Sequence, residues 1–489
     1  MFTRDIELFI KSYVEDITAG TAAIFAGAGL SIPAGFVSWK ELIRDIAYEL
    51  ELDVDKETDL VSIAQFHLNE KRNRSAINKK IINEFSIQAK ETENHKIIAR
   101  LPIKTIWTTN YDNVIETSYS NINKVCDVKV SPNDITSSIH KRDVVLYKMH
   151  GDSKSPSEAI LTKAQYESYY HTHAPFINTL TGDLTTKTFL FIGFSFEDPN
   201  LQYILSRLYV QYEENAKSHY CIMRKVQFGD RGNESKADFD YNKRKQILMI
   251  NDLKRYGIQT LEVDDYSEVT AILKAVEREV KKGTIFISGS ADIYTPYEQD
   301  DAVKFIHRLS KGFILRNYRV VNGFGWGVGT SVINGALEAI YDSQGKISES
   351  QLIMRPFPQF ATGGTTIQAL WHEYRQRMIS LSGITIFIFG NKKNNEGNII
   401  EANGVFDEFE ISINNGSTCI PIGCTGFASK KIFEIIEKKP MDIYIRNPAA
   451  MELLKKLNEG GGLINKEEYV FQLLAIIDKD KHHDKKMFL

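Results

Sequence analysis

Cysteine is scarce in this chain, and its spacing does not suit metal binding. The 489 residues include four cysteines, Cys126, Cys221, Cys419 and Cys424, and no two form a Cys-x-x-Cys pair. Structural zinc sites need closely spaced cysteines, and disulfide-stapled domains need many of them. We therefore expect no disulfide framework, no cysteine zinc site and an activity that needs no metal.

Long apolar runs and a strong charge of one sign are also missing. No apolar stretch approaches the ~20 residues that span a bilayer, and the amino-terminal residues lack the basic-then-apolar order of a signal peptide. The formal net charge of −3 gives no electrostatic reason to expect binding to nucleic acid or to an anionic membrane. We expect a cytoplasmic protein with neither kind of partner.

What is present indicates a globular protein of more than one domain. Hydrophobic residues make up 43% and charged residues 25% of the chain, as in soluble globular proteins. A chain of this length exceeds one ordinary core. Strand-like apolar runs alternate with helical patterns, which is typical of parallel sheets wrapped by helices. The expected strands are 22–26, 103–109, 144–149, 188–192, 220–223 and 259–263, then 284–287, 318–321, 351–354, 384–389 and 418–422.

The predicted fold class is α/β, with two Rossmann-like, doubly wound domains whose sheets are largely parallel. We predict the first domain at residues 1–283 and the second at 284–489. The polar stretch 55–95 has a helical pattern and predicts a helical insertion in the first domain. Just before it, Ser38 and Glu41 have the spacing of a capping box, which predicts a helix starting after Ser38.

Two segments combine an apolar strand, closely spaced glycines and a following helix. Residues 22–31 contain Gly27 and Gly29, and residues 318–330 contain four more glycines, Gly323, Gly325, Gly327 and Gly329. Glycine lets a backbone turn sharply and approach a ligand, and amides at a helix start can point at phosphate oxygens. A plain tight turn is the alternative for each. Two such loops predict two nucleotide sites, one for chemistry and one for sensing.

Polar residues follow the strands of the first domain, at the end where open α/β sheets bind ligands. Asn110 and Asp112 follow one strand, and His150 follows the next. Histidine suits the role of a base near neutral pH, here toward a ribose hydroxyl or a water. Asn110 can orient water or ribose hydroxyls with both its donor and its acceptor. Asp112 can hold a carboxamide.

Each of these residues also has a structural alternative. A histidine after a strand can serve packing alone, and Asn110 is a typical turn former. Asp112 can cap the helix that begins near Asn113. The occurrence of all three in one domain favours a catalytic site, and His150 and Asn110 are its candidate catalytic residues.

The first domain resembles the sirtuin-type NAD-binding domain over roughly residues 8–280. The matching motifs, in family order, are Gly27-Ala28-Gly29-Leu30-Ser31, Thr108-Thr109-Asn110-Tyr111-Asp112, His150-Gly151 and Gly193-Phe194-Ser195. The resemblance implies NAD+ as substrate. It also implies phosphate binding by Gly27, Ala28, Gly29 and Ser31, and binding of the adenosine side by Gly193 and Ser195.

The chain departs from sirtuin deacylases in three ways. The four-cysteine zinc module of those enzymes has no counterpart, and their Gln-Asn-Ile-Asp stretch reads Thr109-Asn110-Tyr111-Asp112 here. The arginine common beyond their glycine loop is not evident near Trp39. These departures favour NAD+ cleavage with water as the acceptor over peptide deacylation.

The second domain resembles the SLOG family of Rossmann-like modules, which bind nucleotide-derived ligands. The matching residues are Gly289, Ser290, Gly323, Gly325, Gly327, Gly329, Arg375, Lys392 and Glu408. Glycine amides take phosphate, Arg375 and Lys392 can add charge-assisted bonds, and Glu408 can accept from ribose hydroxyls. A solvated surface arginine is the alternative for Arg375. The Pro-Gly-Gly-x-Gly-Thr-x-x-Glu stretch of phosphoribohydrolase relatives is missing, which favours sensing.

A sirtuin-type domain followed by a SLOG domain resembles the NAD-consuming effectors of the bacterial Thoeris antiphage system. The resemblance implies an NAD+ hydrolase that is allosterically activated by a cyclic ADP-ribose isomer and depletes NAD+ during infection. It implies a TIR-domain partner enzyme that makes the activator, and a homotetramer or higher assembly. Two rival functions are an NAD-dependent protein deacylase and a non-catalytic nucleotide-binding regulator; the presence of Asn110 and His150 argues against the second.

Overall fold

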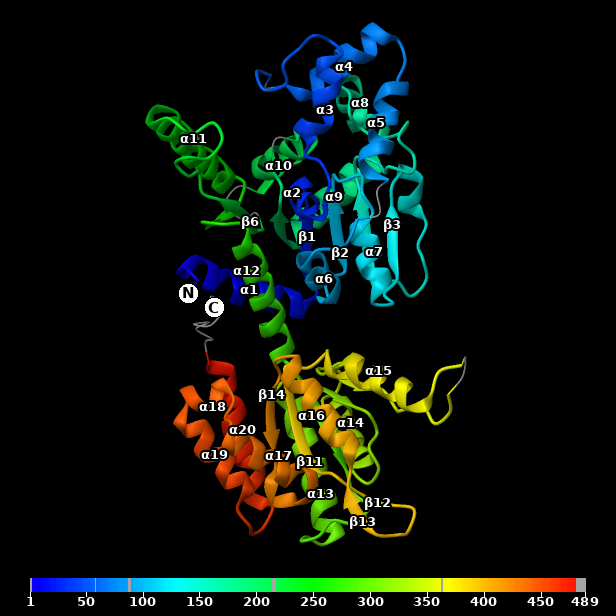
Figure 1. The fold of residues 1–489 in the computed structure, drawn as a ribbon, viewed down its shortest axis with the longest axis vertical. Coiled ribbons are helices and arrows are strands. Elements are labelled where there is room, and N and C mark those ends of the chain that lie inside the picture. Colours follow the sequence, from blue (N-terminus) through cyan, green and yellow to red (C-terminus); the bar gives the residue numbers. More distant parts are fainter. Residues whose placement is uncertain are drawn as a thin grey trace. The chain divides into compact units, whose positions relative to one another are not determined.

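The computed structural model describes residues 2–57, 59–86, 89–196, 198–212, 217–361 and 364–480 (Figure 1). It divides into two compact units, Phe2–Glu277 and Arg278–Leu489, called here the first and second unit. The division falls within helix α12 (Ser267–Lys282). The domain ranges 1–283 and 284–489 stay predictions. In the described ranges, no helix has the length and apolar character needed to cross a membrane.

The first unit is built on a seven-stranded sheet in the order β3-β4-β2-β1-β5-β6-β7. All its strand pairs are parallel. The central strands β1 and β5 are buried along their whole length, and their sequences are therefore almost continuously apolar. The strands are β1 (Ala22–Ala26), β2 (Thr105–Thr108), β3 (Cys126–Lys129), β4 (Val144–Lys148), β5 (Thr188–Ile192), β6 (His219–Arg224) and β7 (Ile258–Val263).

The α/β class with parallel sheets is confirmed, and the six strands expected in the first unit all occur. Strand β3, at the edge of the sheet, was not predicted. Two of its four residues are charged, Asp127 and Lys129, so it lacks an apolar run. The two side chains are buried because they pair with each other at 2.8 Å. That ion pair, which the sequence pattern does not reveal, lets a polar segment form a strand.

The helices of the first unit cover both faces of the sheet and extend beyond it at one end. Helices α3, α4 and α5 pack together there through residues such as Leu42, Ile63 and Ile81, and α4 and α5 occupy the stretch expected to be a helical insertion (Figure 1). The helices are α1 (Arg4–Ala19), α2 (Ala28–Ser31), α3 (Trp39–Tyr48), α4 (Leu60–Lys71), α5 (Ser75–Phe85), α6 (Glu93–Arg100), α7 (Val114–Asn121), α8 (Lys163–Thr172), α9 (Ala174–Thr186), α10 (Pro199–Tyr212) and α11 (Lys236–Arg255), followed by α12.

The strand order determines where a ligand can bind in the first unit. From β1 the chain proceeds outward to β2 on one side and later to β5 on the other, so the connections diverge at β1. Open α/β sheets bind ligands at such a switch point, outside the carboxyl ends of the strands. Ala26, the last residue of β1, is in register with Thr108 of β2 and Ile192 of β5. The three segments that follow these strands therefore emerge side by side.

The second unit contains a five-stranded parallel sheet in the order β10-β9-β8-β11-β14 and a separate antiparallel hairpin, β12–β13. Its connections diverge at β8. The five expected strands occur, whereas the polar hairpin was not predicted. The strands are β8 (Thr284–Ser290), β9 (Arg319–Asn322), β10 (Leu352–Met354), β11 (Ile384–Phe389), β12 (Asn391–Lys393), β13 (Ile399–Glu401) and β14 (Thr418–Pro421).

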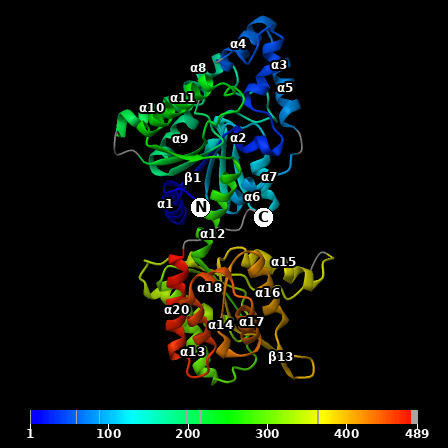
Figure 2. The ribbon, with the colours of Figure 1, turned by 60° about the vertical axis from the view of Figure 1, so that its left-hand side comes forward.

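Helices pack around the second sheet to form one large core. Helix α13 lies against α14 and α20, and Figure 2 shows α13 and α20 side by side. Phe305, Val332 and Leu473 are examples of core residues from these three helices. The helices are α13 (Gln299–Leu315), α14 (Gly329–Asp342), α15 (Ile367–Ile379), α16 (Asn403–Asn414), α17 (Phe427–Lys438), α18 (Asp442–Arg446), α19 (Pro448–Asn458) and α20 (Ile464–Lys479).

Candidate active site

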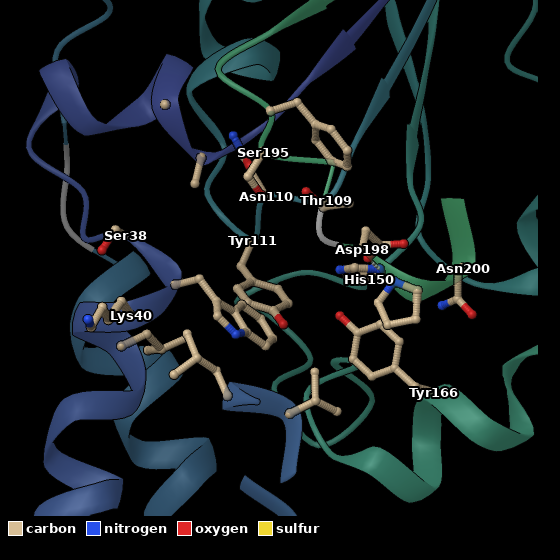
Figure 3. A pocket seen from close by; sticks show the side chains of 18 of the residues that line it. Ser38, Lys40, Thr109, Asn110, Tyr111, His150, Tyr166, Ser195, Asp198 and Asn200 are labelled. Carbon is tan, nitrogen blue, oxygen red and sulfur yellow. Dashed lines mark ion pairs between the residues drawn. The ribbon is translucent and has the colours of Figure 1, made fainter. Parts of the chain in front are cut away.

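A cavity of about 1070 Å³ opens at the carboxyl ends of β1, β2, β4 and β5, and helices α3, α8 and α10 complete its walls (Figure 3). Small-molecule sites are typically ~300–1,000 Å³, so this cavity has room for a dinucleotide. Every sequence-predicted residue of the first unit lines it except Gly27. These residues are Ala28, Gly29, Ser31, Asn110, Asp112, His150, Gly193 and Ser195.

The glycines after β1 and β5 are needed for contact between two backbones. A Cβ on Gly27 would lie 2.4 Å from the Gly193 carbonyl oxygen, and one on Gly29 would lie 2.7 Å from the Gly193 Cα. Gly193 itself has a φ of +64°. The Gly27 and Gly29 amides donate to the carbonyls of Ile192 and Gly193, each at 2.9 Å. These amides are therefore occupied, and phosphate binding by this loop remains a prediction.

Asn110 ties the segment after β2 to the glycine loop. Its Nδ2 donates to the Gly27 carbonyl oxygen and to Ser31 Oγ, both at 3.0 Å. Both amide hydrogens are thus engaged within the protein. Among the described residues nothing donates to Asn110 Oδ1. The oxygen is therefore the group that can accept from a water or a ribose hydroxyl.

Asp112 fits both interpretations that the sequence allowed. Its Oδ1 accepts from the Val114 amide at 3.0 Å, at the start of α7. Its Oδ2 is buried and has no hydrogen-bond partner in the described part of the chain. Because Asp112 also lines the cavity, one oxygen holds the first amide of α7 while the other is available to a donor such as a carboxamide.

His150 follows β4 and lies in a cluster with Tyr166 and Asp198 (Figure 3). Its Nε2 is 3.0 Å from Asp198 Oδ2, and both side chains are buried. The contact lacks hydrogen-bond geometry, so Nε2 has no hydrogen-bond partner among the residues described. The Tyr166 ring meets the imidazole edge-on at 5.4 Å. Burial and then the charge of Asp198 raise the pKa of Tyr166 well above its usual value, so its hydroxyl stays a donor.

A fully buried lysine, Lys148, forms hydrogen bonds with the segments that carry Asp112 and His150. Its Nζ donates to Asp152 Oδ2 at 2.6 Å, to Glu116 Oε1 at 3.0 Å and to the Asp112 carbonyl oxygen at 2.6 Å. Burial alone would lower the pKa of Lys148, but the carboxylates of Glu116 and Asp152 raise it above its usual value. The lysine is therefore charged, and it links the segments after β2 and β4.

Sequence reasoning missed three residues beside His150: Tyr166, Asp198 and Asn200. Asn200 lines the cavity, and its buried Nδ2 has no hydrogen-bond partner within the described ranges. One sequence pattern could have indicated Asp198 as a residue of the site. Asp198-Pro199 follows a strand and has the capping aspartate and first-turn proline of a helix N-terminus, which α10 confirms. Tyr166, inside helix α8, has no comparable signal.

In the second unit, the four-glycine run packs against the end of β8. A Cβ on Gly325 would lie 2.0 Å from the Gly289 carbonyl oxygen, and one on Gly289 would lie 2.3 Å from the Ile388 carbonyl oxygen. Gly327 has a φ of +71°, and its carbonyl accepts from Tyr294 Oη at 2.8 Å. Glycine is therefore required for a compact loop at the switch point of this sheet.

The two remaining members of that run also sit in tight places. A Cβ on Gly323 would lie 2.7 Å from the Phe357 ring. A Cβ on Gly329, at the start of α14, would lie 2.7 Å from the Phe324 Cα. All four glycines of the run thus have a packing reason, and binding of an activator by them remains a prediction.

Arg375 and Glu408 lie together in the second unit and form a chain with Ser288. Arg375 Nε is 3.4 Å from Glu408 Oε1, and Ser288 Oγ donates to Glu408 Oε2 at 2.6 Å. Burial raises the pKa of Glu408. The guanidinium also lies over the Phe357 ring, 5.1 Å from its centroid. Arg375 is therefore fixed by its contacts with Glu408 and Phe357, and it is not the freely solvated arginine of the alternative interpretation.

Lys392 and Ser290 lie near each other at the hairpin. Lys392 is exposed on β12. Ser290 Oγ donates at 3.0 Å to the carbonyl oxygen of Asn391, the residue that precedes Lys392 in the chain. Their roles in binding remain predictions, as do those of the other predicted activator-binding residues.

Metal ligands are not gathered anywhere in the described part of the chain: no group of three or more His, Cys, Asp or Glu side chains could hold an ion. The four cysteines are unpaired, and three of them are buried.

Comparison with known proteins identifies both units. Residues 104–250 match the SIR2-like domain family, and residues 268–480 match the Sir2- and TIR-associating SLOG family. The chain is 47% identical to the NAD(+) hydrolase ThsA of Bacillus cereus (strain MSX-D12), over 92% of this chain and 93% of that one. It is 41% identical to the NAD(+) hydrolases ThsA of Acinetobacter baumannii (strain 532279), over 94% and 96%, and of Enterococcus faecium, over 97% and 100%.

Proposed function

The chain belongs to the ThsA family of NAD(+) hydrolases, and on that premise we propose that the cavity of its first unit cleaves NAD+ into nicotinamide and ADP-ribose. The observation that carries the assignment is the placement of Asn110, Asp112 and His150 around one cavity at the switch point of a parallel sheet. Asn110 Oδ1 and Asp112 Oδ2 have no protein hydrogen-bond partner among the described residues, and the His150 imidazole lines the same cavity.

These atoms suit hydrolysis of the nicotinamide–ribose bond. His150 takes a proton from the attacking water, or first from a ribose hydroxyl. The water oxygen bonds to the anomeric carbon, and the electron pair of the breaking bond leaves with nicotinamide. Asn110 Oδ1 orients the water by accepting its other hydrogen. Asp112 Oδ2 accepts from the carboxamide of nicotinamide and holds the leaving group.

We further propose that a cyclic ADP-ribose isomer, made by a TIR-domain partner enzyme, activates the hydrolase from the second unit. The match to a family described as Sir2- and TIR-associating supports this. In the site described above, a phosphate of the activator would compete with Glu408 for Arg375. An effector can shift an enzyme only by its differential affinity for the active state. NAD+ depletion in the cytoplasm by a homotetramer or larger assembly would then act in antiphage defence of the Thoeris type.

The deciding experiment is release of nicotinamide from NAD+ by the full chain, with and without cyclic ADP-ribose isomers. We expect hydrolysis that at least one isomer increases. No release under any of these conditions would refute the catalytic assignment, and equal release with and without every isomer would refute the activation. Turnover of an acyl-lysine peptide would instead indicate a deacylase. Chelation should leave the rate unchanged, and a loss restored by zinc would contradict metal-independent chemistry.

A further inference from the structure

The carboxylate of Asp198 faces the imidazole that the proposed reaction uses as its base. Asp198 Oδ2 lies 3.0 Å from His150 Nε2, a distance that a charge-assisted hydrogen bond spans. Hydrogen bonds of catalytic groups are often poorly aligned before substrate binds and tighten in the complex.

The position of Asp198 is set by the first turn of α10. Its Oδ1 accepts from the Leu201 amide at 2.9 Å, and its carbonyl accepts from the Gln202 amide at 3.0 Å. Gln202 Nε2 donates at 2.7 Å to the carbonyl of Phe196, a residue with a φ of +62°. The Oδ1 atom and the backbone of Asp198 are therefore fixed by the first turn of α10. Its other carboxylate oxygen, Oδ2, faces His150.

Capping α10 does not require the negative charge of Asp198. Asparagine and serine cap helices about as well as aspartate, and burying a carboxylate costs free energy unless a partner compensates it. The groups beside this carboxylate are His150, whose Nε2 is 3.0 Å from Oδ2, and Tyr166, whose ring packs against the imidazole. The negative charge of Asp198 is thus explained by its contact with His150 and not by capping of the helix.

We propose that Asp198 is a positioning residue for NAD+ cleavage: with Tyr166 it orients the His150 imidazole and holds its proton on Nε2. The lone pair of the neutral ring is then on Nδ1, and this nitrogen takes the proton from the water or ribose hydroxyl. The inference rests on the proposed function for its kinetic consequence. The tautomer of His150 can be measured without any turnover.

The kinetic test compares Asp198→Asn, Asp198→Glu and Tyr166→Phe with the wild-type full chain, under the conditions where wild type releases nicotinamide. Asp198→Asn keeps a capping oxygen and removes only the charge. We expect its kcat to fall ~10²-fold or more, as for general acid–base groups, with KM for NAD+ and the melting temperature little changed. Asp198→Glu should recover part of kcat, and Tyr166→Phe should lose less than Asp198→Asn.

Asp230→Asn is the matched control, because it removes a carboxylate that pairs with Arg224 outside the cavity lining. It should behave as wild type. A wild-type kcat in Asp198→Asn would overturn the proposal. A loss of kcat accompanied by a lower melting temperature and a higher KM would also overturn it, because it would show a purely structural role.

The second test is nitrogen-15 NMR of histidine-labelled protein, with the His150 signals identified by their loss in His150→Ala. We expect the Nε2-protonated tautomer in wild type and its loss in Asp198→Asn. Equal tautomer populations in both would overturn the inference even in an active enzyme. If wild type released no nicotinamide, the proposed function would fail while this measurement still decided the role of Asp198.

Discussion

Lys148 Nζ lies 2.6 Å from the carbonyl oxygen of Asp112, although Lys148 ends strand β4 and Asp112 follows strand β2. The lysine is fully buried, and its charge is balanced by Asp152 and Glu116. This contact holds the end of β2, with Asn110 and Asp112, against the turn that carries His150.

Replacing Lys148 with methionine should destabilise the first unit strongly. Methionine is similar in length but leaves two buried carboxylates without their cation, and breaking a buried pair costs ~3–5 kcal/mol of unfolding free energy. Lys225→Met is the control, because Lys225 and Asp264 form an exposed pair, worth ~0–1 kcal/mol. Thermal and urea denaturation measure both. Equal midpoints for the two variants would contradict the bracing role of Lys148.

His150→Ala and Asn110→Ala should each lose most NAD+ hydrolysis. General acid–base groups contribute ~10²–10⁴-fold, and Asn110 additionally anchors the glycine loop through Gly27 and Ser31. Both variants should melt at a lower temperature than wild type, because His150→Ala removes a buried partner of the Asp198 carboxylate and Asn110→Ala removes that anchor. Nicotinamide release and thermal melts test this. Turnover near the wild-type rate in either variant would remove that residue from the catalytic assignment.

Arg375→Ala should lose the response to activator, because one charge-assisted phosphate partner disappears. Arg377→Ala is the matched control: it lies on the same helix, is exposed and pairs with Glu373. Calorimetric titration with the activating isomer, alongside hydrolysis assays, measures both. His150→Ala should still bind the activator, because its lesion lies in the other unit. Normal binding by Arg375→Ala with no binding by His150→Ala would show that sensor and catalyst are assigned to the wrong units.

Glu408→Gln should change how stability depends on pH. Burial raises the pKa of Glu408 above 4.5 in the folded state, so the folded protein holds this proton more tightly than the unfolded chain. That contribution to stability is present below about pH 4.5 and is lost as the pH rises through the folded pKa. Glutamine does not titrate. The stability of the variant relative to wild type should therefore rise from pH 4 to pH 8, as measured by calorimetry; a constant difference would contradict the prediction.

The sequence predicted elements well where burial leaves a simple pattern. Ser38 caps α3 as expected, accepting from the Glu41 amide at 3.2 Å. The reciprocal half of the capping box was wrong: the Glu41 side chain does not reach back but binds Arg44 at 2.8 Å. An exposed glutamate has several partners of similar energy within reach, so local spacing does not decide among them.

The sequence by itself determined which chemistry meets at the sheet edge. Glycine, asparagine and histidine follow successive apolar strands, and parallel strands bring all their carboxyl ends to one edge. Only the tertiary structure decided which polar atoms remain available there. The hydrogens of Asn110 Nδ2 are occupied by Gly27 and Ser31, while its Oδ1 is not. It also placed Asp198 against His150. Such contacts join residues distant in the chain, and they depend on side-chain directions that only the packed strands and helices set.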